Sequence, residues 1–535
     1  MKRINIYILL SIFLFAFWGC EDLDTLPESE TVTTAQKEDI YTLDPEKAEA
    51  EVNAIFAKFN QYQPNSTTVG DVDNDYGFSS IMLFTDHNGY DLVASDVGYN
   101  WNSNDLDFSD RLYTSYISEI VWNDMYSIIY ATNNVISSID PKTEDATSQF
   151  YLAQGLATRA YSYWVLAQLY QFNYVGHESD LCVPIVTNLS SDSLAIIGGG
   201  ARATVQEVYG QIKSDIDAAI TLLTSAQKGN ITRADKRYIS LAVAYGIRAR
   251  MNLTMQNWST AAADADSAIT ISSATPASIS DVSVPYFWDA SESNWMWGII
   301  ISETDDVVAS QIINWISHMG SFNYGYCTVN NGKQINKALY NSIASSDVRK
   351  GWWIDENLVS TNLTDDQAAY IAGMGFPAYT QVKFAPYNNE LGTTTNANDI
   401  PLMRIEEMYL IKAEAEAMSG GDGKSTLESF VQTYRDQEYK CDATSASDIQ
   451  EEVFRQRRIE LWGEGLNWFD VMRLNKNVDR RGGGYPDETM VLNIMAGDNI
   501  LLWRIPEAEI QSNNNISEED NNPPAPRPEP VTDFD

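Results

Sequence analysis

The sequence predicts a mainly α-helical fold, a tetratricopeptide-like array of helical pairs with an irregular loop-rich region that carries a few short strands. Apolar residues recur at three- and four-residue spacing in long segments between 112 and 270, as they do on one face of a helix. Alanines stand at many of these positions, so that neighbouring helices can approach closely. Between 271 and 400 the period is lost, and Ser, Asn, Gly and Asp alternate with aromatic residues. That change predicts the loop-rich region.

The first residues are typical of an export signal. Two basic residues precede an apolar run from Ile4 to Trp18, which is shorter than the roughly 20 residues that span a bilayer. The run ends at Cys20, and acidic residues follow directly. This resembles a bacterial lipoprotein processing site, at which the cysteine carries lipid after cleavage; the alternative is an ordinary secretory peptide. We expect lipidation of Cys20, and acidic residues after such a cysteine accompany export to the cell surface.

Periodic apolar residues mark the helices. Helices are predicted over 41–59, 112–138, 150–170, 205–223, 234–253, 258–268, 404–418, 427–436 and 448–475. Pro45 suits a first helical turn, and Thr204 and Glu207 form a capping box. Gly463 and Gly465 would each weaken an isolated helix by roughly 1 kcal/mol, which predicts tight packing or a break there.

Two long segments of the body of the chain lack a helical period. Residues 60–108 are predicted to form a long, irregular and exposed insertion, and residues 271–400 are predicted to contain short strands at Val284–Trp288 and Trp295–Ile301. The expected organisation is a signal peptide over 1–19, a tether over 20–40, an N-terminal helical region over 41–270 with a variable insertion over 60–108, a loop-rich ligand-binding region over 271–400, a C-terminal helical region over 401–512 and a disordered tail over 513–535.

Composition excludes several classes of function. The 74 acidic and 35 basic residues give a net charge of -39, which repels phosphate backbones, so nucleic acid is not expected as a partner. The three histidines, His87, His177 and His318, have no metal-ligand spacing, and neither a metal nor a cofactor is predicted. The three cysteines after Cys20 are interpreted as small buried hydrophobes; a single disulfide among them is the alternative.

Several segments together resemble the SusD/RagB family of outer-membrane nutrient-binding lipoproteins. The most characteristic is the stretch from Arg457 to Arg473, and the helix from Arg404 to Ala415 precedes it. Further matching segments are Ala157–Tyr170, Val183–Val186, Arg202–Tyr209 and Trp503–Pro506. The resemblance implies a scaffold of tetratricopeptide-like helical pairs, an irregular region that holds the binding surface, and a TonB-dependent SusC-type barrel over which the lipoprotein sits as a lid.

The resemblance also implies the function. We expect a lipid-anchored protein on the extracellular side of the outer membrane, which captures oligosaccharides for a SusC-type transporter without catalysis. Peptides are an alternative ligand, because some members of the family take peptides. A secreted glycoside hydrolase is the less favoured alternative, since neither a nucleophile elbow nor an HExxH motif occurs.

The stretch that carries the resemblance is strongly charged. Its charged residues include Arg458, Glu460, Glu464, Asp470 and Arg473. One interpretation makes two carboxylates the acid and the base of glycoside hydrolysis. We favour an ion-pair network that fixes a helix against the array, because carboxylates at helical spacing beside arginines satisfy each other. Such pairing lowers the carboxylate pKa, which does not suit a general acid.

Sugar binding requires flat aromatic rings for the C–H faces and polar side chains for the hydroxyl rim. Loops that combine the two are the candidates. The predicted ligand-binding residues are Tyr99, Trp101, Asn102, Trp315, Tyr324 and Tyr326. For each of them the alternative is a packing role, the commoner fate of tryptophan and tyrosine. Trp164, Trp462 and Trp468 lie in helical segments and are expected in the core.

Overall fold

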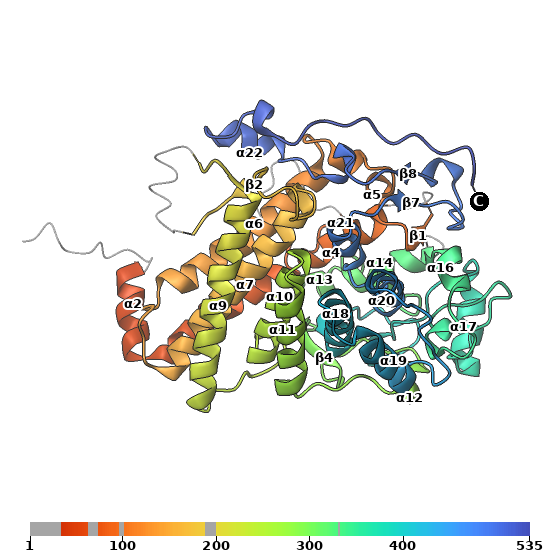
Figure 1. The fold of residues 1–535 in the computed structure, drawn as a ribbon, viewed down its shortest axis with the longest axis horizontal. Coiled ribbons are helices and arrows are strands. Elements are labelled where there is room, and N and C mark those ends of the chain that lie inside the picture. The colour runs from red at the N-terminus through yellow and green to blue at the C-terminus, as the bar shows by residue number, and fades with distance from the viewer. Residues whose placement is uncertain (1–33, 63–72, 96–100, 188–198, 330–331, 535) are drawn as a thin grey trace, which may run out of the picture.

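Helices dominate the computed structural model, which describes residues 34–62, 73–95, 101–187, 199–329 and 332–534 (Figure 1). The longer helices are α2 (Thr34–Leu43), α3 (Glu49–Ala57), α4 (Phe78–Asn88), α6 (Tyr116–Ser137), α7 (Ala146–Tyr170), α9 (Val205–Lys228), α10 (Leu241–Thr254), α11 (Trp258–Ile271), α17 (Asp365–Met374), α18 (Ile405–Met418), α19 (Gly423–Tyr434) and α20 (Ala446–Glu460). The shorter ones are α5 (Ser103–Leu106), α12 (Ile279–Val282), α13 (Asp306–Ala309), α14 (Trp315–Met319), α15 (Tyr326–Val329), α16 (Lys337–Asn341), α21 (Asn467–Arg473) and α22 (Glu507–Ser512). Within this part of the chain, no helix combines the length and the hydropathy that a membrane crossing needs.

The helices α6, α7, α9, α10 and α11 form a side-by-side array, in which each helix packs against the next (Figure 1). The helix α7 lies in its middle, and every residue from Phe150 to Tyr170 is buried. Gly155 permits the close approach of α6, because a Cβ there would lie 3.0 Å from a side-chain carbon of Ile136. The capping box of Thr204 and Glu207 starts α9 as expected. The predicted mainly α fold class with packed helical pairs is confirmed.

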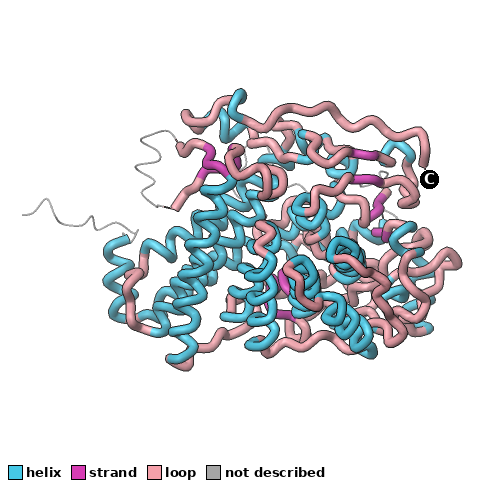
Figure 2. Tube along the Cα trace, in the orientation of Figure 1, coloured by secondary structure: helices cyan, strands magenta, loops and turns pink. Residues whose placement is uncertain are grey.

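The array continues after a long insertion. The helix α18 packs against α11, and α19 and α20 pack against α18, although residues 272–404 intervene between α11 and α18. Within this insertion, β4 (Trp295–Ile299) pairs antiparallel with β6 (Ile400–Arg404), which directly precedes α18. Loops are concentrated in the part of the molecule around α16 and α17 (Figure 2). The predicted loop-rich segment is therefore held at both ends by the helical array.

The strands are short and form two-stranded antiparallel pairs. Besides β4 and β6, these are β1 (Leu92–Ala94) with β5 (Lys333–Ile335), β2 (Leu181–Pro184) with β3 (Arg202–Thr204), and β7 (Val478–Asp479) with β8 (Asn493–Ile494). The strand expected over Trp295–Ile301 is thus present. The one expected over Val284–Trp288 is wrong, because only an isolated bridge between Tyr286 and Phe384 occurs there.

The expectation of an exposed irregular insertion over 60–108 is wrong for its central part. The helix α4 is buried along its whole length, from Phe78 to Asn88. Polar residues such as Ser79, Asp86 and Asn88 are buried in it together with the apolar ones, so the sequence shows no apolar stripe that alternates with a solvent-facing polar face. Its neighbours in space include α6 and α21. This segment therefore lies in the core.

The glycines at 463 and 465 produce both expected effects. The helix α20 ends at Glu460 and α21 begins at Asn467, and the two glycines between them have φ values of 75° and 70°. A Cβ at Gly465 would lie 2.6 Å from the Cβ of Met82 on α4. The break therefore lets α4 lie directly against the turn between α20 and α21.

The C-terminal segment differs from the expected disordered tail. Asn522 is buried, and its side-chain amide donates to the carbonyl groups of Tyr170 at 2.8 Å and Trp503 at 2.7 Å. Further along, the Val531 amide donates to the Val491 carbonyl at 2.9 Å. Hydrogen bonds from asparagine side chains, and not periodic apolar residues, fix this segment. The hydrophobic pattern of the sequence therefore did not predict its order. At the other end, α2 begins inside the expected tether of 20–40.

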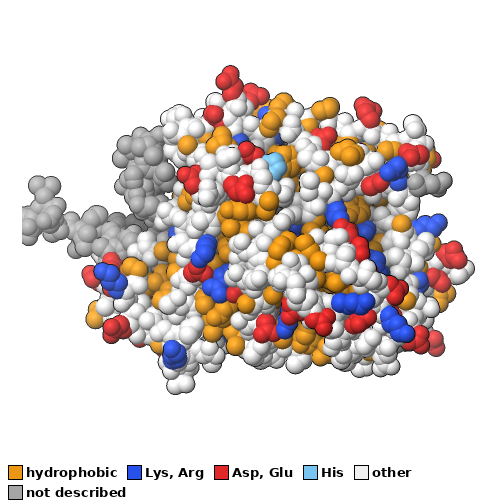
Figure 3. All heavy atoms as spheres, in the orientation of Figure 1, with side chains coloured by type: hydrophobic (Ala, Val, Ile, Leu, Met, Phe, Trp, Pro, Cys, Tyr) orange, Lys and Arg blue, Asp and Glu red, His pale blue; other side chains and the backbone are white. Residues whose placement is uncertain are grey.

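Other expectations about the core hold. Trp164, Trp462 and Trp468 are buried, and Cys182, Cys327 and Cys441 are buried free thiols. On the face shown in Figure 3, acidic and basic side chains are interspersed over the surface.

Candidate ligand-binding site

A strand pair brings two of the predicted loops together. The strand β1 leads towards Trp101, and β5 follows the loop that contains Tyr324 and Tyr326. They pair antiparallel, with Leu92 opposite Ile335. Residues more than two hundred positions apart in the sequence therefore meet beside this pair.

Trp101 and Tyr326 are in ring contact. Their ring centroids lie 6.4 Å apart with an interplanar angle of 70°, an edge-to-face arrangement. Trp101 is half-buried, and its carbonyl accepts a hydrogen bond from the side chain of Asn74 at 2.9 Å. Among the described residues, the indole Nε1 of Trp101 and the amide oxygen of Asn74 have no hydrogen-bond partner. The structure thus brings together two of the six predicted ligand-binding residues.

Tyr326 ends a stack of three rings. It stacks on His318 at 4.8 Å, and His318 stacks in turn on Tyr76 at 5.4 Å. The Nε2 of His318 lies 2.8 Å from the carbonyl oxygen of Asp73, and the Tyr326 hydroxyl donates to the Asp73 carboxylate. Asp73 is therefore tied through its backbone to one ring of the stack and through its side chain to another.

Burial sets the charge state of this cluster. Lys333 on β5 is buried, and burial lowers its pKa to about 8. Burial and the positive charge of Lys333 lower the pKa of His318 to about 3. The imidazole is therefore neutral at neutral pH, and its Nε2 carries the proton that is donated to Asp73.

Asn102 points into the molecule. It is buried, and its amide nitrogen lies 3.2 Å from the Asp105 carboxylate while its oxygen lies 3.5 Å from the Lys333 Nζ. Burial and the neighbouring charge of Asp110 raise the pKa of Asp105 well above its usual range. The structure thus corrects the expectation that Asn102 faces a ligand, because this buried side chain contacts Asp105 and Lys333 and stabilises the loop from inside the protein.

The remaining predicted ligand-binding residues do not lie beside Trp101 and Tyr326 in the described structure. Trp315 is 1% exposed and packs edge-on against Phe384 at 5.0 Å, so its expected role in ligand binding gives way to a role in the core. Tyr324 is 51% exposed. Its backbone is held by Thr393 and Asn396, and it makes no ring contact with Trp101 or Tyr326. Tyr99 and Cys20 lie outside the described residues.

Sequence reasoning missed Asp73, Asn74, Tyr76 and His318, which surround the Trp101–Tyr326 pair. The first three lie in a short run of Asp, Asn and Tyr before α4, a composition that resembles the recognised candidate loops. His318 is one of only three histidines in the chain. Neither signal indicated which side chains would meet in space.

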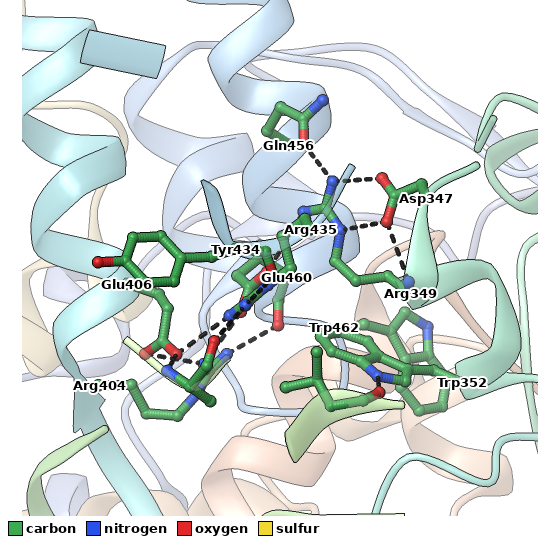
Figure 4. A network of polar contacts seen from close by, with 12 residues as sticks. Asp347, Arg349, Trp352, Arg404, Glu406, Tyr434, Arg435, Gln456, Glu460 and Trp462 are labelled. Atoms are coloured by element: carbon green, nitrogen blue, oxygen red, sulfur yellow. Dashed lines mark hydrogen bonds and ion pairs between the residues drawn. The ribbon is translucent and has the colours of Figure 1, made fainter. Parts of the chain in front are cut away.

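The charged stretch forms the favoured ion-pair network (Figure 4). Glu460 is buried among three guanidinium groups, with Arg404 at 3.0 Å, Arg435 at 2.8 Å and Arg349 at 3.3 Å. Burial alone would raise the pKa of Glu460, but these arginines hold it well below its usual range. Glu464 is similarly paired with Arg404 and Lys383, and its pKa is also lowered. The network joins segments of the insertion to α18 and α20.

The other charged residues of the stretch also have partners. Asp470 is bound by Arg457 at 2.6 Å and by Arg473 at 2.8 Å, and Arg473 also binds Glu414. Arg458 reaches Asp91, which lies directly before β1. The interpretation as an ion-pair network is confirmed, and one of its pairs anchors the strand that leads towards the Trp101 loop.

Comparisons with known proteins agree with this architecture. Residues 37–253 match a SusD-like family described as starch-binding and associating with the outer membrane, and residues 321–524 match the SusD family. A comparison with curated proteins gives no match. The two family matches cover most of the chain.

Solved structures show the same fold. The chain is similar to a SusD-like carbohydrate-binding protein from Bacteroides vulgatus, with a TM-score of 0.69 and 21% identity over 89% of this chain and 97% of that one. It is also similar to the surface glycan-binding protein A from Bacteroides thetaiotaomicron, solved in complex with laminarihexaose, with a TM-score of 0.61 and 15% identity over 88% of this chain and 98% of that one. At these identities the likeness is one of fold. With both family matches, it shows that this chain belongs to the SusD/RagB family.

Proposed function

We propose that this protein is a surface lipoprotein that binds neutral oligosaccharides at the Trp101–Tyr326 pair and passes them to a SusC-type transporter without cleaving them. The observation that carries the proposal is the half-buried Trp101 ring, held edge-on by Tyr326 beside the Asp73 carboxylate. The membership of a family described as starch-binding supports the ligand class.

The chemistry of the cluster suits a sugar. An indole ring covers the C–H face of a pyranose, while a carboxylate accepts hydrogen bonds from the hydroxyl rim. The rings are fixed before a ligand arrives, because Tyr326 is stacked on His318 and bonded to Asp73. A preorganised site loses less side-chain entropy on binding.

The anchor and the transporter follow from the sequence and the family. Lipid on Cys20 would hold the protein to the outer membrane, and the family is described as associating with that membrane. Buried cations pair with Glu460 and Glu464 and lower the pKa of both carboxyl groups. This favours a structural role for these carboxylates over acid catalysis.

The test is calorimetry of the purified protein with a panel of neutral oligosaccharides that includes maltohexaose and laminarihexaose. Replacement of Trp101 by alanine removes the stacking face, so we expect a loss of about 2 kcal/mol, roughly 30-fold in Kd. The control is Trp258→Ala, since Trp258 is also half-buried but begins α11 outside this cluster. Equal affinities for Trp101→Ala and wild type would remove the proposed site.

Chromatography of the same oligosaccharides after incubation with the protein tests whether they are cleaved. Intact oligosaccharide after prolonged incubation is the expected result. Release of shorter sugars by wild-type protein would favour the hydrolase alternative, and binding of oligopeptides alone would favour the peptide alternative.

A further inference from the structure

A cavity lies between the end of α3 and the insertion. Its volume is about 310 Å³, at the small end of the roughly 300–1,000 Å³ that ligand pockets occupy. It is lined by Asn53, Phe56, Ala57, Phe59, Asn60 and Gln61 on one side and by Arg237, residues 297–300, residues 304–306 and Leu402 on the other. None of these residues belongs to the Trp101–Tyr326 cluster.

Aromatic rings form the apolar part of this cavity. Phe59 and Trp297 meet edge to face, with centroids 6.0 Å apart and an interplanar angle of 70°. The indole Nε1 of Trp297 donates to the Arg237 carbonyl at 2.9 Å, which fixes the ring in the strand β4. Phe56 adds a third ring to the lining. Phe59 and Trp297 are 2% and 1% exposed, so these rings are core side chains at the bottom of the cavity and offer little surface to a ligand. The polar groups of the lining must therefore supply most of the contacts.

Two asparagines supply complementary polar groups. The side-chain oxygen of Asn53 accepts a hydrogen bond from the Tyr238 hydroxyl at 2.7 Å, which leaves its NH2 group to donate. The NH2 group of Asn60 lies 3.1 Å from the Asp305 carboxylate, which leaves its oxygen to accept. A hydroxyl group both donates and accepts, so this pair of amides suits a ligand that carries several hydroxyls.

The charges of the lining disfavour an anion. Arg237 is the one cation among the described residues of the lining, and Asp235 lies 3.0 Å from its Nε and compensates its charge. Asp305 and Asp306 add two carboxylates, of which Asp306 is exposed. An acidic sugar or a phosphate would meet net negative charge here, whereas a neutral sugar would not.

We propose that this cavity is a second carbohydrate site, which binds one or two neutral sugar units independently of the Trp101–Tyr326 pair. This inference rests on the proposed function for the class of ligand. A second site on the same chain would raise the avidity for long or branched glycans, because two weak contacts to one polymer act together.

The experiment blocks the cavity from either wall. Ala57 is half-buried and lines the cavity, so Ala57→Trp fills it from α3; Thr304→Trp fills it from the facing loop. The matched control is Ala54→Trp, because Ala54 is an exposed residue of the same helix outside the lining. Two blocking variants on different elements guard against a folding defect in one of them.

Crystals are soaked with glucose, maltose and glucuronate, and sugars are titrated by calorimetry into the Trp101→Ala background. We expect electron density for glucose or maltose in the cavity and none for glucuronate. Residual binding in Trp101→Ala should persist with Ala54→Trp and disappear with Ala57→Trp and with Thr304→Trp. An empty cavity in every soak, or equal binding by the blocking variants and the control, would overturn the inference. An unchanged affinity in Trp101→Ala alone would instead count against the first site.

Discussion

The imidazole of His318 stacks on the phenol ring of Tyr326, with ring centroids 4.8 Å apart and an interplanar angle of 27°. The same imidazole contacts Tyr76 on its other face and donates to the Asp73 carbonyl. One buried side chain thus supports the Tyr326 ring and the backbone of Asp73, both of which belong to the proposed sugar site.

Replacement of His318 by alanine should therefore weaken sugar binding. The loss of two ring contacts, each worth about 0.5–1.5 kcal/mol, should raise Kd roughly tenfold. His318→Phe keeps the stack and loses the hydrogen bond, so its affinity should lie between those of alanine and wild type. The measurement is calorimetry with the oligosaccharide that wild type binds best, and His177→Ala is the control because His177 lies outside the cluster. An alanine variant that binds like wild type would show that the stack does not position Tyr326.

The pH dependence of stability provides a second test of the same residue. The pKa of His318 is lowered from its usual 6.5 to about 3 in the folded protein. Below pH 6.5 the unfolded chain therefore binds a proton that the folded protein does not, so stability is present above pH 6.5 and is lost as the pH falls towards 3. His318→Phe should lose less stability than wild type over this range, as measured by Tm at successive pH values. Parallel curves for the two proteins would contradict the lowered pKa.

Glu460 is expected to be one of the most sensitive positions in the chain. Glu460→Gln removes a negative charge that Arg349, Arg404 and Arg435 share. Each arginine keeps another carboxylate, Asp347 for Arg349 and Glu406 for the other two, so the expected cost is about 3 kcal/mol, the lower end of the range for breaking a buried ion pair. Urea unfolding should show this loss in the free energy of unfolding. Glu438→Gln, at an exposed position, is the matched control and should change stability by less than about 0.5 kcal/mol. Similar unfolding curves for both variants would mean that the network contributes little to stability.

Gly465→Ala should destabilise the fold through geometry alone. The residue has a φ of 70°, and a Cβ would lie 2.6 Å from the Cβ of Met82. Left-handed strain and overpacking together should cost about 2–4 kcal/mol. Gly373→Ala on α17 is the control, because nothing lies within 4 Å of its Cβ position, and it should be neutral or stabilising by up to about 1 kcal/mol. Thermal unfolding of the two variants measures the difference.

The helical scaffold was predictable because amphipathic helices leave a period in the sequence. The segment from Phe150 to Tyr170 and the capping box at Thr204 appear in the structure as expected. The helix α4 was missed because both its polar and its apolar residues are buried, so that no apolar stripe alternates with a solvent-facing polar face. The C-terminal segment was missed because buried asparagines such as Asn522 hold it through hydrogen bonds.

The residues of the proposed binding site were predictable only in part. Trp101 and Tyr326 were selected as aromatics in polar loops, and the structure brings them together. Trp315 stands in similar sequence but packs in the core against Phe384. Tyr326 is itself buried at 7% exposed, and Trp101 is half-buried. Local composition does not distinguish these three rings, and only tertiary packing separates them. His318 could not be assigned, because its role depends on two rings and a backbone group from distant segments.

The pairing of β4 with β6 has a consequence for how such proteins diversify. Because β4 and β6 close the stretch between residues 299 and 400 at one two-stranded pair, this stretch can lengthen, shorten or change composition while the packing of α11 against α18 stays the same. Ligand specificity can therefore change independently of the scaffold. Substitutions or insertions inside this closed segment can alter the carbohydrate preference and leave the packing of the helices unchanged.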